Sequence, residues 1–148
     1  MITHFGFSGG LLPGQLVIEA ATFDPSAHCF VRISGGTIID STYTHGGVKE
    51  RDFTDLNYDW IKLIPADRLL TVSQNYRLEV WLRDRIGRPY DKGFIIGYPW
   101  TRRWQDDDSY VCSELLAAGL VAVGALVIPH MHRVTPRNLR RRIDEKVK

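Results

Sequence analysis

Cys112 is the residue of this 148-residue chain best placed to act as a nucleophile. Ser109 is a good N-cap residue, and a helix capped there would hold Cys112 at its third position. The free N–H groups and the positive dipole at a helix start favour the thiolate, and they could bind an oxyanion. The acidic run Asp106–Asp108 opposes this effect if its charges face the thiol. A small buried core cysteine is the alternative interpretation.

A cysteine nucleophile needs a base, and His28 has the most favourable position of the five histidines. It begins a predicted hairpin whose second strand carries Asp40. A three-residue loop, Ser34–Gly36, places His28 and Asp40 on one face, whereas a two-residue loop turns Asp40 to the other face. In the first register Asp40 can orient the imidazole while the other ring nitrogen accepts the thiol proton.

The remaining histidines and the second cysteine have less specific interpretations. His4 lies in a segment expected to fray, and His45 lies in an expected loop. His130 and His132 are spaced as H-x-H, but no further ligand cluster accompanies them, so neither a metal site nor a cofactor is predicted. Cys29 should point away from the His28 face of its strand and form inert core.

The elements that must position these residues follow from local sequence signals. Strands are predicted at 15–21, 28–34, 37–42, 60–64 and 125–134. A first helix is predicted from the capping box Thr71–Gln74 to the helix breakers Gly87 and Pro89, with apolar residues at helical spacing at Leu78, Trp81, Leu82 and Ile86. A second helix is predicted from Ser109 through Leu120. A third is predicted from Thr135-Pro136 onward. Strands and helices that do not strictly alternate indicate an α+β domain.

Length and composition are those of one globular domain, with 44% hydrophobic and 24% charged residues. Residues 133–148 carry seven Lys or Arg against two Asp or Glu, but no aromatic side chains are interleaved, so we expect no nucleic-acid partner. The most apolar stretch, 119–129, is too short to span a bilayer, so no integral membrane segment is expected. The start MITHFGFSGG has no secretory pattern, and a cytoplasmic protein is expected.

Several short motifs occur together along the chain. The run Tyr-Val-Cys-Ser-Glu-Leu at 110–115 is the most specific, and the others are Ser26–Val31 around His28, Asp40 twelve residues later, Gly47-Val48, Gly87–Asp91 and Val134–Leu139. Together they resemble the circularly permuted NlpC-type branch of the papain-like hydrolases, which includes YiiX-like proteins and is related to the lecithin:retinol acyltransferase group. The resemblance covers about residues 14–139. Cys29, Arg32 and the aspartate at position 40 depart from the usual pattern.

The resemblance implies a papain-like α+β fold over 1–148, with the nucleophile helix packed on a small antiparallel sheet or barrel. It also implies a Cys112–His28–Asp40 triad that cleaves amide bonds through an acyl-enzyme. Expected substrates are small peptides, peptidoglycan fragments or acyl compounds in a bacterial or phage setting, with Tyr90, Tyr110 and Trp104 as candidate substrate-binding residues. Trp100 and Trp104 either cover the cleft or pack on the core. Lipid acyl hydrolysis or transfer, and a non-catalytic binding module, are the alternatives.

Overall fold

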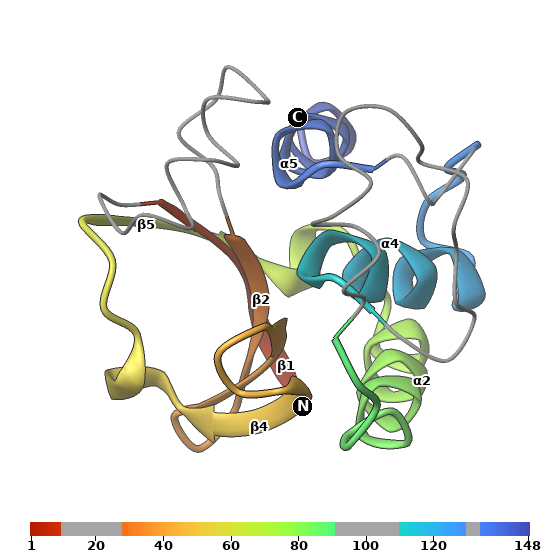
Figure 1. Ribbon diagram of the computed structural model, residues 1–148. Coiled ribbons are helices and arrows are strands. Elements are labelled where there is room, and N and C mark those ends of the chain that lie inside the picture. The colour runs from red at the N-terminus through yellow and green to blue at the C-terminus, as the bar shows by residue number, and fades with distance from the viewer. Residues whose placement is uncertain (10–27, 91–109, 130–133) are drawn as a thin grey trace.

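A five-stranded antiparallel sheet and three helices form an α+β domain in the computed structural model, which describes residues 1–9, 28–90, 110–129 and 134–148 (Figure 1). The strands, in the spatial order β4-β3-β2-β1-β5, are β1 (Ile2–Gly9), β2 (His28–Ile33), β3 (Thr37–Thr42), β4 (Gly47–Asp52) and β5 (Trp60–Pro65). The helices are α2 (Val72–Arg83), α4 (Cys112–Ala122) and α5 (Pro136–Lys146), with short 3-10 turns η1 (Phe53–Asp55) and η2 (Ala66–Arg68).

The β2–β3 hairpin has the three-residue loop that the site requires. Arg32 pairs with Ile38 and Val31 with Ile39, which leaves Ser34–Gly36 as the loop. Gly35 and Gly36 have φ values of 108° and 92°, a region that glycine enters without steric cost. The prediction of an odd-length loop is therefore confirmed.

β1 corrects the expectation that the first residues fray, because it lies between β2 and β5 in the sheet. Phe5 and Phe7 are fully buried on its helix-facing side. The side chain of Asn75 fixes the start of the strand: its Oδ1 accepts from the Ile2 N–H at 2.9 Å, and its Nδ2 donates to the Ile2 carbonyl at 2.7 Å. Such paired hydrogen bonds and apolar burial outweigh the fraying of a terminus.

The predicted helices are present, with differences at their ends. Thr71 and Gln74 form the capping box of α2, but the helix ends at Arg83, so Ile86 lies outside it and is 41% exposed. Thr135 caps α5 by accepting from the Asn138 N–H. The 60–64 strand is confirmed as β5, whereas β4 was not predicted.

The predicted strand over 125–134 is wrong for its described residues, 125–129 and 134, which form no strand. The N–H groups of Ala125 and Leu126 return to the carbonyl of Leu120, so they close the end of α4 instead of joining a ladder. Ala125, Leu126 and Ile128 are still buried, so the apolar run packs on the core without a strand partner. The predicted strand at 15–21 lies outside the described residues.

The sheet has a different cover on each face. In Figure 1 the three helices lie on one side, and the 53–59 segment lies on the other. α4 packs against β2 and β3 and buries Leu115, Leu116 and Leu120. On the second face Phe30 is buried against Phe53, at 6.1 Å between ring centroids. None of the helices in the described ranges is long and apolar enough to cross a membrane.

Candidate active site

His28 and Asp40 lie on the same face of the hairpin and are hydrogen-bonded. The distance from His28 Nε2 to Asp40 Oδ2 is 2.8 Å, and both residues are buried, at 6% and 1% exposure. Burial would raise the pKa of Asp40, but the hydrogen bonds and the charges of His28 and Arg51 outweigh this effect and lower it. An ionised carboxylate only accepts, so Nε2 carries the proton and Nδ1 is left for another partner.

Arg51 on β4 is a second partner of Asp40. Its Nε donates to Oδ1 at 3.2 Å and its Nη2 donates to Oδ2 at 2.5 Å. Arg51 pairs with Ile38 in the β3–β4 ladder, so its side chain lies on the same face as Asp40 and diagonal to it. This two-point contact fixes the plane of the carboxylate, and the carboxylate in turn fixes the imidazole.

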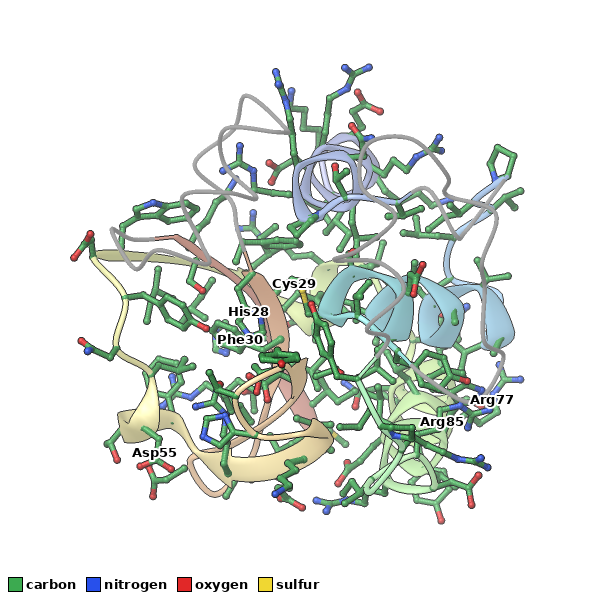
Figure 2. The ribbon with its side chains drawn as sticks, in the orientation of Figure 1. His28, Cys29, Phe30, Asp55, Arg77 and Arg85 are labelled. Atoms are coloured by element: carbon green, nitrogen blue, oxygen red, sulfur yellow. The ribbon has the colours of Figure 1, made fainter. Side chains whose placement is uncertain are left out.

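Tyr58, in the segment that follows η1, covers the imidazole. Its ring stacks on His28 with the centroids 5.6 Å apart and the planes at 22°. Phe30 lies 6.3 Å from the imidazole centroid. Figure 2 shows His28 and Phe30 along β2. The ring of His28 is therefore held by aromatic contacts as well as by Asp40.

Cys112 is the first residue of α4, which corrects the expected helix start at Ser109. Val111 has extended backbone angles, φ −83° and ψ 162°, and occupies the N-cap position. The Val111 N–H donates to Glu114 Oε2 at 3.5 Å, so Glu114 helps to cap the start of α4. Cys112 still lies in the first turn, where N–H groups have no partner within the helix. Ser109 and Asp106–Asp108 lie outside the described residues.

The segment that leads into α4 lies against β3, and α4 packs against both β2 and β3. The Ser41 hydroxyl donates to the Tyr110 carbonyl and holds this segment against β3. Cys112 lies close enough to the His28 imidazole and to Cys29 for both residues to alter the pKa of its thiol. The structure thus brings Cys112, His28 and Asp40 together in series.

The charges of this series favour a thiolate. The hydrogen bond from the Cys29 thiol, with the charge and hydrogen bond of His28, lowers the pKa of Cys112 well below its usual value, although burial acts in the opposite direction. Burial also opposes a charge on His28, but the attraction of Cys112 and the Asp40 hydrogen bond raise its pKa well above the usual value. The pair therefore favours a Cys112 thiolate and a His28 imidazolium.

The candidate substrate-binding residues occupy different places. Tyr110 packs edge-on against Trp81 at 6.3 Å, and its hydroxyl accepts from Arg85 Nε at 3.4 Å, so its ring is held on α2 rather than at the thiol. Tyr90 is half-buried and lies edge-on to Tyr43 at 6.0 Å. Trp104 and Trp100 lie outside the described residues.

Three residues of the site were missed from the sequence. Arg51 could not be placed because β4 was not predicted, and Tyr58 lies in an irregular segment without a periodic signal. Cys29 alternates with His28 and lies in the buried core, as predicted, but Cys112 belongs to the same core cluster and interacts with it, which the sequence did not indicate. Within the described ranges no group of three or more His, Cys, Asp or Glu side chains could hold a metal ion, while His130 and His132 lie outside them.

Comparison with known proteins adds no relative. No protein-family model matches the chain, and a search of curated proteins finds no match.

Proposed function

We propose that this chain is a cysteine hydrolase that cleaves amide bonds through Cys112, His28 and Asp40. The observation that carries the proposal is the hydrogen bond from His28 to the buried Asp40, beside a Cys112 thiol whose pKa His28 lowers. Burial and the hydrogen bond to Cys112 raise the pKa of Cys29, so its thiol stays protonated, whereas the pKa of Cys112 is lowered. A lowered thiol pKa is typical of a nucleophile and not of a structural cysteine.

In the proposed reaction the Cys112 thiolate attacks the carbonyl carbon. The C–N bond then breaks as the His28 imidazolium gives its Nδ1 proton to the leaving nitrogen. The N–H groups of the first turn of α4, which have no acceptor within the helix, are suited to stabilise the oxyanion. Water attacks the resulting thioester with His28 as the base, which releases the acid and restores the thiolate. Apart from the substrate and this water, every group that takes part in these steps belongs to this chain.

The arrangement also supports a papain-like fold of the permuted type. A nucleophile at a helix start packs on an antiparallel sheet, and adjacent strands of that sheet supply the base and the acid that orients it. The order along the chain is His28, Asp40, Cys112. Small peptides, isopeptides and peptidoglycan fragments are the proposed substrates.

The test is a comparison of the wild type with Cys112→Ala on peptide, isopeptide and acyl-ester libraries. We expect amide cleavage by the wild type only, and an acid-quenched reaction should carry the acyl group on Cys112 by mass spectrometry. His45→Ala removes an exposed loop histidine and serves as the control for His28→Ala. Cleavage of esters alone would indicate the lipid acyl alternative, and equal activity of wild type and Cys112→Ala would refute the proposal.

A further inference from the structure

The two cysteines of the chain lie against one another. Cys29 is buried on β2, and Cys112 is buried at the start of α4, which packs against β2. Both residues belong to the same hydrophobic core cluster. In Figure 2 the Cys29 sulfur points to the start of α4. The two thiols are therefore neighbours in the core, and each alters the pKa of the other.

The two thiols differ in protonation. Burial, and then the hydrogen bond to Cys112, raise the pKa of Cys29 well above its usual value, so Cys29 is the S–H donor. The lowered pKa of Cys112 makes it the acceptor, and a thiolate is also the form that peroxides oxidise. The pair thus consists of a reactive sulfur and a protonated sulfur within reach of it.

We propose that Cys29 and Cys112 are a redox pair, in which a hydroperoxide oxidises Cys112 and Cys29 then closes a disulfide with it. The pair is a modification site that requires no substrate of the hydrolase, so it goes beyond the proposed function. Cys112 is 8% exposed and Cys29 is 1% exposed, which favours a reagent as small as hydrogen peroxide and direct attack on Cys112 alone.

The chemistry balances with groups already at the site. The Cys112 thiolate attacks one peroxide oxygen, the O–O bond breaks, and the departing hydroxide takes the proton of the His28 imidazolium, which leaves a sulfenic acid and water. The sulfur of Cys29 then attacks the Cys112 sulfur, the S–O bond breaks, and the Cys29 proton leaves with the hydroxide as a second water. Two thiol sulfurs lose two electrons, and one peroxide gains them.

The consequence is a reversible loss of the nucleophile. A disulfide removes the thiolate at Cys112, and a dithiol reductant restores it. It also prevents further oxidation of the sulfenic acid to sulfinic and sulfonic acids, which dithiols do not reverse.

The test measures the oxidation state of both sulfurs and needs no substrate. The reduced full chain is treated with an excess of hydrogen peroxide, about five equivalents, because the sulfenic, sulfinic and sulfonic acids consume one, two and three equivalents in turn. It is then unfolded in iodoacetamide and analysed by intact-protein mass spectrometry. We expect both alkylation sites to disappear together and a cross-linked Cys29–Cys112 peptide to appear until dithiothreitol is added. In Cys29→Ser the same treatment should leave Cys112 as sulfinic or sulfonic acid.

The inference fails if wild-type Cys112 reaches the sulfinic acid while Cys29 is still alkylated, if neither sulfur reacts, or if the product is a disulfide-linked dimer. A chain that forms the internal disulfide but cleaves no library substrate would retain the redox pair and lose the hydrolase proposal.

Discussion

His28 Nε2 donates to Asp40 Oδ2 across the β2–β3 hairpin at 2.8 Å, and both residues are buried. The two residues are twelve positions apart and lie diagonally on one face, which the three-residue loop Ser34–Gly36 makes possible. A loop one residue shorter would turn Asp40 to the helix side of the sheet. The register of one hairpin therefore decides whether the proposed triad can assemble.

Replacing Arg51 tests the support of Asp40. Arg51→Met should lower the free energy of unfolding by about 3 kcal/mol at pH 7, because a buried carboxylate loses a two-point partner. The lowered pKa of Asp40 gives stability that is present above the unfolded pKa of about 3.9 and is lost as the pH falls through the folded value. The difference in free energy of unfolding between the wild type and Arg51→Met, measured by urea unfolding, should therefore be smaller at pH 3 than at pH 7.

Arg32→Met is the matched control, because Arg32 lies on the same face but packs over the Phe53 ring at 4.5 Å. Arg32→Met should lose less free energy of unfolding than Arg51→Met, and its loss should not vary with pH. Equal deficits for the two variants at both pH values would contradict the assigned role of Arg51.

Gly6 makes room for Phe30 beneath the imidazole. A Cβ at position 6 would lie 2.1 Å from the Phe30 ring, so Gly6→Ala should cost about 2 kcal/mol of stability. Phe30→Leu removes the ring atoms that clash. The double variant should therefore lose less stability than the sum of the losses in Gly6→Ala and Phe30→Leu. Strictly additive stability losses in thermal unfolding would show that an alanine at position 6 does not clash with the Phe30 ring.

The pair of hydrogen bonds between Asn75 and Ile2 should be a main anchor of β1. Asn75→Ala leaves a buried N–H and a buried carbonyl of Ile2 without that partner, at a cost of about 2 kcal/mol. Amide exchange at the start of β1 should accelerate more than exchange in β3. Tyr76→Ala, at an exposed neighbour on α2, is the control, and an equal effect of both variants would argue against the anchor.

Local signals were sufficient where neighbouring residues determine the structure. The capping box at Thr71, the cap and proline at the start of α5, and the turn at Gly35-Gly36 each have their partners within a few residues. The register of this turn then places His28 and Asp40 on one face. That part of the site was predictable from the sequence for this reason.

Features that depend on distant partners were not predicted. β1 becomes a central strand because it pairs with β2 and β5 and is anchored by Asn75, which no local pattern indicates. Arg51 approaches Asp40 only through the β3–β4 register. Cys29 meets Cys112 because α4 packs on β2 and buries both cysteines in one core cluster, a tertiary contact that strand alternation does not reveal.

The most direct test of the account is the pH dependence of Cys112 alkylation by iodoacetamide, followed by peptide mass spectrometry. We expect Cys112 in the wild type to react near pH 6 well before Cys29, because the pKa of Cys112 is lowered and that of Cys29 is raised. His28→Ala should move the midpoint upward by more than about one pH unit, since the imidazolium no longer stabilises the thiolate. His45→Ala should leave it unchanged. Slow and equal labelling of the two cysteines in the wild type, or a midpoint that does not respond to His28→Ala, would contradict the central claim.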